Sequence, residues 1–311
     1  MVLIIVYVLI GFVFILFVFY KQLKRKLISV IIPAENFKSS NFIENKISLL
    51  TYNIAGLPER ISAAKTSRNT SIAEIGMKVE PFDIVNVQED FNYNTALYSG
   101  NQHPFRTDTR GKIPYGDGLN TVSKYPIIEY HRIPWRNCSG SDCWTVKGFS
   151  FAKIQLASQV VVDVYNVHAN AGHTARASKA RRENLRQLAA YIHEHSAGQP
   201  LIVMGDFNAH YTFKKDNLHE FILTTGLIDG WVVFLQKGIF PEIAPKFIPL
   251  EKLTLRNETE SLDKIFFRNS KNVQFSVVDY QVEIARFKNS AGLDLSDHLA
   301  VSMELQWVWK A

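Results

Sequence analysis

The stretch LIVMGDFNAH, residues 201–210, joins an apolar run to a pair of oxygen-bearing side chains. The apolar run is typical of a buried strand, and Gly205 after it allows another group to approach the backbone closely. In an extended chain, residues two apart project to the same side, so Asp206 and Asn208 would leave the strand together. An Asx turn, in which these side chains bond to their own backbone, explains the same letters. The rest of the chain has to decide between the two interpretations.

The composition is that of a globular protein with a large core. The chain has 311 residues, of which 47% are hydrophobic and 21% are charged. This length accommodates a membrane element plus one large domain, or two ordinary domains. The formal net charge of +6 suits an anionic partner, such as nucleic acid, a phospholipid surface or a phosphate ester. The charge is too small to choose between these partners.

The N-terminus differs from the rest of the chain. Residues 2–20 are apolar or aromatic except for Gly11, and the basic cluster KQLKRK follows at 21–26. A run of this length reaches the roughly 20 residues that are needed to cross the hydrocarbon core of a bilayer. It lacks the positive n-region and the small residues of a cleaved signal peptide. The sequence therefore predicts a single-pass membrane protein with a transmembrane helix over residues 1–20.

The sequence leaves open which side of the membrane carries the remaining chain. The basic cluster after the span favours the cytosol by the positive-inside rule. Cys138 and Cys143, the only cysteines, bracket the loop CSGSDC, and a disulfide there would favour an oxidising compartment. Sequons at Asn69, Asn137 and Asn257 would be glycosylated if they were translocated. Reduced cysteines and chance sequons explain the same letters, so neither side is preferred.

After a basic juxtamembrane segment and linker at 21–45, one domain is expected over 46–311. Strands are expected at 47–52, 82–87, 159–167, 201–204, 262–268 and 299–306, and helices at 67–79, 174–195 and 217–225. Many of the expected strands follow one another without a helix between them. This order favours stacked sheets flanked by helices over a simple doubly wound sheet.

Strand after strand ends in residues that can bind a metal ion or transfer a proton. The five motifs are TYN (51–53), QE (88–89), HAN (168–170), GDFN (205–208) and SDH (296–298). Each motif alone is explained better by turn formation, helix capping or a satisfied core histidine. All five together, at strand ends throughout one domain, indicate a shared site.

The residue types in these motifs indicate a particular chemistry. Carboxylate and amide oxygens without a nearby cysteine suit a hard divalent ion, Mg²⁺ or Mn²⁺. Two histidines, His168 and His298, would supply a general base and a group that stabilises charge on a phosphate. Metal, base and anion stabiliser together describe hydrolysis of a phosphate ester by an activated water molecule.

In this order, the five motifs together with SLDKIFF (261–267) resemble the endonuclease/exonuclease/phosphatase superfamily. That superfamily includes DNase I-like nucleases, inositol polyphosphate phosphatases and neutral sphingomyelinases. The resemblance runs from about residue 47 to residue 307. It implies that residues 46–311 form the catalytic domain, with an α/β fold. The implied architecture is a four-layer α/β/β/α sandwich, in which two packed mixed sheets are flanked by helices.

The resemblance also implies the metal ligands. Glu89 would be the main Mg²⁺ ligand, Asn53 would lie beside it, and Asp297 would complete the metal shell. Mn²⁺ is the alternative ion.

Proton transfer and substrate positioning are implied in the same way. His298 would be the general base, and Asp263 would orient it, because a base needs a third group to fix its tautomer. His168 would contact the scissile phosphate. Asp206 and Asn208 would position the attacking water and the phosphate, or bind a second ion, and Asn170 would assist.

Three features favour a lipid phosphodiesterase within this superfamily. The first is the expected membrane anchor. The second is Lys147-Gly148-Phe149, which resembles the KGF segment of sphingomyelinases and implies that Lys147 binds substrate. The third is SKYPI (123–127), which nucleases share. The expected reaction is therefore release of phosphocholine from a sphingomyelin-type phospholipid, as a phospholipase C performs it. The expected partners are a phospholipid membrane and a phosphodiester substrate, and no motif indicates an obligate protein partner.

Two alternatives remain. A DNase I-like nuclease is favoured by the basic residues of the expected helix at 174–195, although an ordinary solvated helix face explains them better. A catalytically inactive binding protein with the same fold is disfavoured, because a decayed enzyme would have lost at least one of these site residues. The apolar insert 232–255 could touch a membrane or lie in the core.

Overall fold

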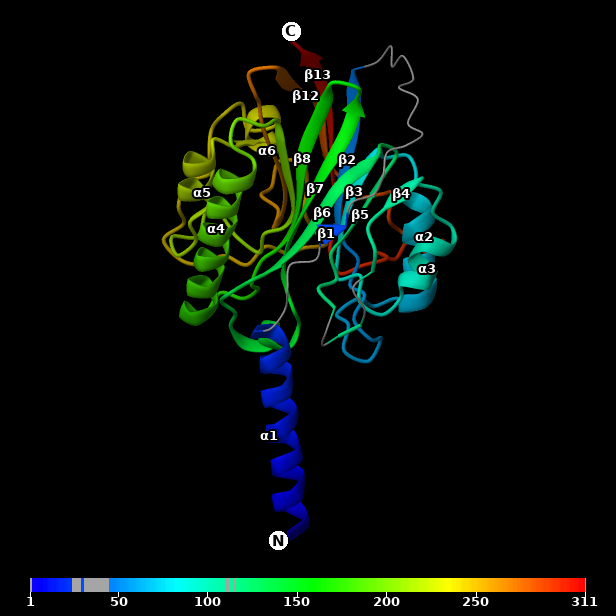
Figure 1. Ribbon diagram of the computed structural model, residues 1–311, viewed down its shortest axis with the longest axis vertical. Coiled ribbons are helices and arrows are strands. Elements are labelled where there is room, and N and C mark those ends of the chain that lie inside the picture. Colours follow the sequence, from blue (N-terminus) through cyan, green and yellow to red (C-terminus); the bar gives the residue numbers. More distant parts are fainter. Residues whose placement is uncertain (1, 24–28, 31–44, 110–111, 114–115, 311) are drawn as a thin grey trace.

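The protein folds into two packed sheets covered by helices on both outer sides. The computed structural model describes residues 2–23, 29–30, 45–109, 112–113 and 116–310 (Figure 1). Within these residues, one sheet has the order β1-β6-β7-β8-β9-β11-β10 and the other has the order β12-β13-β2-β3-β5-β4. Both sheets mix parallel and antiparallel pairs, since β8 is parallel to β9 and β2 is parallel to β3. The predicted α/β/β/α sandwich is therefore confirmed.

The strands of the first sheet include the stretch that ends in GDFN. Its members are β1 (Ser29–Val30), β6 (Ile127–Pro134), β7 (Gly148–Ala157), β8 (Val160–His168), β9 (Leu201–Asp206), β11 (Asp263–Arg268) and β10 (Ile228–Asp229). The second sheet consists of β12 (Val273–Val282), β13 (Val301–Trp309), β2 (Lys46–Asn53), β3 (Ile84–Gln88), β5 (Asn120–Ser123) and β4 (Phe105–Arg106).

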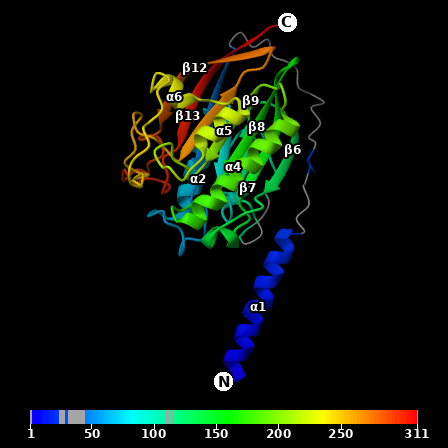
Figure 2. The ribbon, with the colours of Figure 1, turned by 90° about the vertical axis from the view of Figure 1, so that its left-hand side faces the viewer.

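The helices lie on opposite sides of the sandwich. Figure 1 places α2 (Arg68–Lys78) and α3 (Asn94–Ser99) beside one sheet, and α4 (Ala175–His195) and α5 (Leu218–Thr225) beside the other. Figure 2 shows α4 and α5 together across the strands of their sheet. The short helix α6 (Gly230–Phe234) and the 3-10 helix Gly140–Trp144 lie in connections. The expected helices at 67–79, 174–195 and 217–225 thus correspond to α2, α4 and α5.

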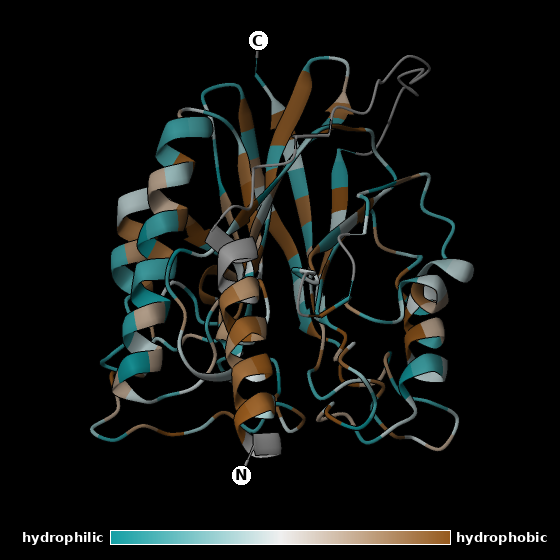
Figure 3. Ribbon diagram, turned by 60° about the horizontal axis from the view of Figure 1, so that its bottom comes forward, coloured by the Kyte–Doolittle hydropathy of each residue, from teal (hydrophilic) through white to brown (hydrophobic). Residues whose placement is uncertain are grey.

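Side chains along β2 point alternately to the two faces of the strand and so contribute to two separate apolar clusters. Ile47 and Leu49 belong to the large apolar cluster between the sheets, whereas Leu50 and Tyr52 belong to a second cluster with Ile72 of α2. Successive side chains of a strand point to opposite faces, so a strand covered on both sides needs apolar residues at every position. Figure 3 shows the apolar residues gathered along the central strands and polar ones along α4.

The prediction of a transmembrane helix over residues 1–20 is wrong. A helix α1 (Val2–Leu23) does form, and it stands apart from the sheets in Figures 1 and 2. Crossing a bilayer requires a helix that is both long enough and apolar enough over that length. No helix in the described part of the chain meets both requirements. The predicted single-pass membrane localisation is therefore not supported. Most of the predicted linker at 21–45 lies outside the described residues.

Candidate functional site

The strand ends that carry the motifs meet at one edge of the two sheets. In one sheet, β2 runs parallel to β3, so Asn53 lies opposite Gln88, next to Glu89. In the other, β8 runs parallel to β9, and His168 lies opposite Asp206. The antiparallel strand β11 begins at the same edge, where Asp263 pairs with Asp206. The topology therefore collects side chains from five segments that are far apart in sequence.

Asn53 connects the two sheets at this edge. Its side-chain amide Nδ2 donates to Glu89 Oε1 and to Asp206 Oδ2, each at 3.1 Å. The Asn53 carbonyl oxygen accepts a hydrogen bond from Ser296 Oγ at 2.7 Å, which fixes the SDH loop. One buried amide thus holds carboxylate oxygens from both sheets close to a common point.

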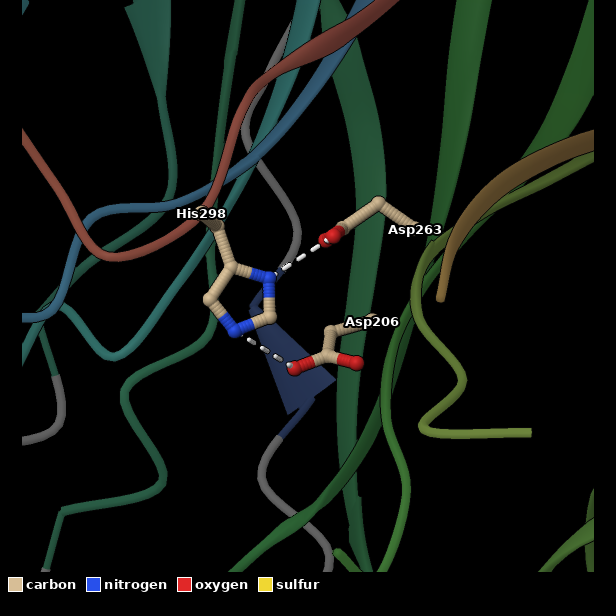
Figure 4. Close-up of side chains that lie close together, drawn as sticks. All are labelled: Asp206, Asp263 and His298. Atoms are coloured by element: carbon tan, nitrogen blue, oxygen red, sulfur yellow. Dashed lines mark hydrogen bonds and ion pairs between the residues drawn. The ribbon is translucent and has the colours of Figure 1, made fainter. Parts of the chain in front are cut away.

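His298 lies between two carboxylates (Figure 4). Its Nδ1 is 2.7 Å from Asp263 Oδ2, and its Nε2 is 3.7 Å from Asp206 Oδ2. Burial lowers the pKa of His298, but the negative charges of Asp263 and Asp206 outweigh this and raise the pKa to about 9. The ammonium group of Lys252 contacts the same Nε2 and opposes protonation there, because two donors cannot share one hydrogen bond. The two carboxylates by themselves thus favour the imidazolium, whereas the Lys252 contact is possible only with the neutral ring, in which Nδ1–H donates to Asp263 and Nε2 carries a lone pair.

His168, the last residue of β8, also faces Asp206, together with Glu89. Its Nε2 lies 3.5 Å from Asp206 Oδ2 and 4.0 Å from Glu89 Oε1. Burial, together with the positive charge of Lys147, holds the pKa of His168 well below its usual value. His168 is therefore a neutral imidazole at physiological pH, and it can donate a single hydrogen bond.

Glu89 is held in a backbone conformation that few non-glycine residues adopt. Its φ is 61°, in the left-handed region. Two glycines make room for this turn: an added Cβ would lie 2.1 Å from Glu89 O at Gly56, and 2.9 Å from Glu89 Cα at Gly118. Sequence reasoning did not assign these glycines to the site. The signal that was available is the pair of glycines that follows TYN and precedes the strand at 120.

The GDFN segment forms an Asx turn and also presents a side-chain oxygen to the site, so both interpretations of its sequence hold. Asn208 has a φ of 49°, and its backbone N–H donates to Asp206 Oδ1 at 3.0 Å, which is the Asx turn. The second oxygen of Asp206 still faces Asn53 and the two histidines. The expected close approach at Gly205 comes from the neighbouring strand, since an added Cβ would lie 2.1 Å from Val167 O.

Lys147 and Asn170 are positioned by the cysteine loop. Cys138 and Cys143 form a disulfide, with their Cα atoms 5.3 Å apart. Asn170 Oδ1 accepts from the backbone N–H of Ser139 at 2.7 Å. The ammonium group of Lys147 lies 2.9 Å from an oxygen of Asp142, a residue of the same loop. Asn170 and Lys147 also line a cavity of about 40 Å³ beside this loop.

Lys252 is a site residue that sequence reasoning missed. It lies in the long connection between α6 and β11, where apolar residues and prolines gave no indication of chemistry. Its Nζ contacts His298 Nε2 and lies 3.6 Å from Asp297 Oδ2. Asp297, an expected metal ligand, thus lies at the more exposed margin of the cluster, with 23% of its side chain exposed.

The donor set at this edge fits a hard divalent cation. Ligand atoms of Asp206, Asp263 and His298 lie within 4.8 Å of one another. Asp263 Oδ1 is buried and has no hydrogen-bond partner among the described residues. Burial raises the pKa of Glu89, although Lys147 partly offsets this effect. Clustered buried carboxylates of this kind are stabilised by a cation. The expected ligands Glu89 and Asn53 border this group, and Asp297 is not part of it.

Comparison with known proteins adds independent information. Residues 50–298 match the Endonuclease/Exonuclease/phosphatase family. Proteins named sphingomyelinase from Mycobacterium bovis and Mycobacterium tuberculosis are 38% identical over 263 residues, which cover 82% of this chain and 52% of theirs. The chain therefore spans about half the length of these curated relatives.

Solved structures share the fold at lower identity. Sphingomyelinase C from Streptomyces griseocarneus has a TM-score of 0.57 at 17% identity, covering 83% of this chain and 99% of that one. A beta toxin variant from Staphylococcus aureus with bound magnesium ions has a TM-score of 0.57 at 17% identity, with 83% of this chain and 99% of that one covered.

Proposed function

The chain belongs to the Endonuclease/Exonuclease/phosphatase family, and we propose that it hydrolyses the phosphodiester bond of sphingomyelin-type phospholipids, releasing phosphocholine. The resemblance noted from the motifs is thereby confirmed. The observation that carries the proposal is the hydrogen bond between His298 and Asp263, beside Asp206, in a chain 38% identical to mycobacterial sphingomyelinases. The hydrolase class agrees with the names of these relatives.

His298 is assigned as the general base. Because Nδ1–H donates to Asp263, the lone pair on Nε2 is directed toward the space beside Asp206. A water molecule that gives its proton to Nε2 attacks phosphorus, and the bond from phosphorus to the lipid oxygen breaks. The lipid oxygen leaves as an alcohol after it takes up a proton, and phosphocholine keeps the oxygen of the water.

The remaining polar side chains are assigned to positioning. Neutral His168 donates a hydrogen bond toward the oxygens of the phosphate. A protonated His168 could instead transfer a proton to the phosphate. Asp206 and Asn208 orient the attacking water, and the Asx turn between them limits their freedom. Lys147 and Asn170, which both contact residues of the disulfide loop, are assigned to binding the head group.

Glu89 and Asn53 are assigned as the residues that hold a divalent cation, with Mg²⁺ as the first candidate. Such a cation would supply positive charge to the phosphate as negative charge develops on its oxygens. The assignment of Glu89 is supported by the convergence of its carboxylate oxygen with that of Asp206 beside the Asn53 amide. Asn53 would bind the cation through its side-chain oxygen Oδ1, which also accepts from the backbone N–H of Ala55 at 3.1 Å. The assignment of a cation is also supported by the magnesium ions bound to the beta toxin variant of the same fold.

A lipid is favoured over nucleic acid by the surfaces around the site. Two basic residues of helix α4 are paired with acids: Arg181 with Asp216 at 2.5 Å, and Arg186 with Glu220 at 3.1 Å. In contrast, the connection after α6 exposes apolar side chains, with Ile239 72% and Ile248 61% exposed. Exposed apolar patches suit a lipid aggregate better than a charged nucleic-acid backbone.

The proposal is tested with the purified full chain on two substrates. Sphingomyelin in mixed micelles and supercoiled plasmid DNA are each incubated with MgCl₂, and then with excess chelator. We expect phosphocholine release from sphingomyelin that requires the added metal, and loss of this activity in His298→Ala. Nicking of the plasmid without hydrolysis of sphingomyelin would overturn the proposed lipid hydrolysis in favour of a nuclease activity. Full activity of His298→Ala would overturn the assignment of the base.

A further inference from the structure

Lys252 places an ammonium group among the carboxylates of the site, although none of the sequence motifs contains it. Its Nζ contacts the Nε2 atom of His298 and lies 3.6 Å from Asp297 Oδ2. We infer that Lys252 binds a non-bridging phosphate oxygen of the substrate, and that in the substrate-free protein it covers the lone pair of His298. This inference deepens the proposed function and rests on it.

The local structure holds Lys252 at this position. Lys252 is the second residue of a turn in which the backbone N–H of Thr254 donates to Glu251 O at 2.8 Å. The leucines on either side of Lys252 anchor the turn in a small apolar cluster. The cluster comprises Leu250, Leu253, Leu255, Val282, Ile284 and Leu299.

The anchor of this cluster is next to the base itself. Leu299, which directly follows His298, is 2% exposed and belongs to the cluster. The turn and the base are therefore packed on the same support, and the lysine stem starts at a defined distance from the imidazole. A lysine on an unsupported surface loop would lack these apolar neighbours before and after it in the sequence.

The positive charge of Lys252 offsets the repulsion between the carboxylates of the site and an anionic substrate. A phosphodiester is an anion, and it must approach a cluster that contains Glu89, Asp206 and Asp263. Lys147, a second cation near this edge, is already paired with Asp142 at 2.9 Å, and its side chain is 10% exposed. Lys252 is 35% exposed, so its flexible stem can move toward an incoming oxygen. A lysine at this margin offsets repulsion of the substrate.

The contact with His298 also has a chemical consequence. An ammonium group has three donors and no acceptor, so this contact must use the lone pair of Nε2. The same lone pair has to receive the proton of the attacking water. The base is therefore blocked while Lys252 remains in contact with it. A phosphate oxygen carries charge and is a stronger acceptor than a neutral imidazole, so arrival of the substrate draws Lys252 away and releases the base.

The test uses Lys252→Met and Lys252→Arg, with Lys246→Met as the matched control. Lys246 is an exposed lysine of the same connection. Binding of phosphocholine is measured by calorimetry with MgCl₂ present, and KM and kcat are measured on sphingomyelin micelles. We expect Lys252→Met to weaken phosphocholine binding about tenfold or more and to raise KM for sphingomyelin. Lys252→Arg should recover most of this loss, and Lys246→Met should behave as wild type.

Each other result decides the matter. Unchanged phosphocholine binding in Lys252→Met, or no binding by the wild type, overturns the inference. A raised kcat in Lys252→Met with unchanged binding shows a block alone and overturns the phosphate role. If Lys252→Met melts well below wild type, the inference is judged on Lys252→Arg, which keeps the charge and most of the stem. Its phosphocholine binding and KM should then stay close to wild type, and values as poor as those of Lys252→Met overturn the inference.

The binding experiment also separates this inference from the proposed function. If wild type releases no phosphocholine from sphingomyelin but binds phosphocholine through Lys252, the proposed function fails and the phosphate-binding role stands. If wild type is an active sphingomyelinase and its binding is indifferent to Lys252, the proposed function stands and the role of Lys252 fails.

Discussion

The two nitrogens of the His298 imidazole face different carboxylates, and only Nδ1 lies within hydrogen-bonding distance of its carboxylate. Asp263 Oδ2 lies 2.7 Å from Nδ1, whereas Asp206 Oδ2 lies 3.7 Å from Nε2. The tautomer of a histidine is set by the hydrogen bond of its other nitrogen. Asp263 therefore decides which nitrogen of His298 is available to water.

Replacing Asp263 by Asn tests this role. An amide can present its NH₂ group to Nδ1, which would favour the wrong tautomer, so we expect kcat on sphingomyelin to fall about a hundredfold to ten-thousandfold with little change in KM. Steady-state rates at saturating Mg²⁺ measure the effect. Asp279→Asn on the distant strand β12 is the control. A kcat within threefold of wild type would rule out the orienting role.

His210 illustrates how burial lowers the pKa of a histidine near the site. Its ring is 6% exposed, lies beside Phe213 and Phe247, and its Nδ1 has no hydrogen-bond partner among the described residues. Burial, assisted by the positive charges of Lys264 and Arg181, lowers the pKa of His210 to about 4, and Glu260 only partly opposes this. In the unfolded chain the value is about 6.5.

The stability of the protein should therefore depend on pH through His210. Between pH 6.5 and 4 the unfolded chain binds the proton more readily, so stability that is complete above pH 6.5 is lost as the pH falls. We expect His210→Phe to remove roughly 2–3 kcal/mol of the loss between pH 7.5 and 4.5. Urea unfolding at both pH values measures it, with exposed His193→Gln as control. Parallel profiles for wild type and His210→Phe would contradict the prediction.

At the scale of elements, the close approach of β8 and β9 brings His168 beside Asp206. The two strands are parallel neighbours, and at Gly205 the backbone of β8 comes so near that no side chain fits. The glycine of GDFN is thus required by strand packing. The spacing between the strand ends that carry His168 and Asp206 depends on this glycine.

Gly205→Ala tests this requirement. The added Cβ would lie 2.1 Å from Val167 O, which is backbone and cannot rotate away. We expect the free energy of unfolding to fall by about 3 kcal/mol, and kcat to fall as His168 and Asp206 separate. The control is Gly100→Ala, whose Cβ would meet only the flexible Met77 side chain, at 2.8 Å. Equal stability of the two variants would show that β8 and β9 can separate without cost.

At the scale of the whole molecule, buried polar side chains join the two sheets. Asn86 Nδ2 donates to Tyr165 O at 2.9 Å, and Gln88 Nε2 donates to Asn166 Oδ1 at 2.7 Å. Asn53 continues this row to Asp206 at the edge that carries the candidate site. Polar groups in a sandwich core have to be satisfied, so this row fixes how the sheets are aligned. The alignment in turn determines whether the carboxylates from the two sheets meet.

A divalent cation at this edge should stabilise the entire fold. The cation binds the native arrangement of carboxylates and not the unfolded chain, so Mg²⁺ at a hundred times its dissociation constant should add about 2.7 kcal/mol to the free energy of unfolding. Thermal melts with MgCl₂ and with chelator measure the shift, and Glu89→Gln should abolish it while exposed Glu242→Gln keeps it. No shift in the wild type would argue against a resident cation.

Much of the fold was predictable because the signals are local. The apolar strand before GDFN, the amphipathic pattern of α4 and the turn residues that end each strand depend on neighbours in sequence. β6, β7 and β12 were not predicted. The burial along β12 alternates irregularly and includes a bulge between Val277 and Asp279, so its period is weak. The apolar N-terminus predicted a membrane span that no helix of the described chain provides.

The sequence by itself determined the residue types of the site and their order, since each motif is a short local pattern at a strand end. The tertiary structure alone decided which atoms meet. Asn53 reaches Asp206 across 153 positions, and Lys252 reaches His298 across 46. The roles of Gly56 and Gly118 depend on the same distant packing. Such contacts are fixed by the alignment of the two sheets. A short sequence pattern does not specify which distant residue its side chains will contact.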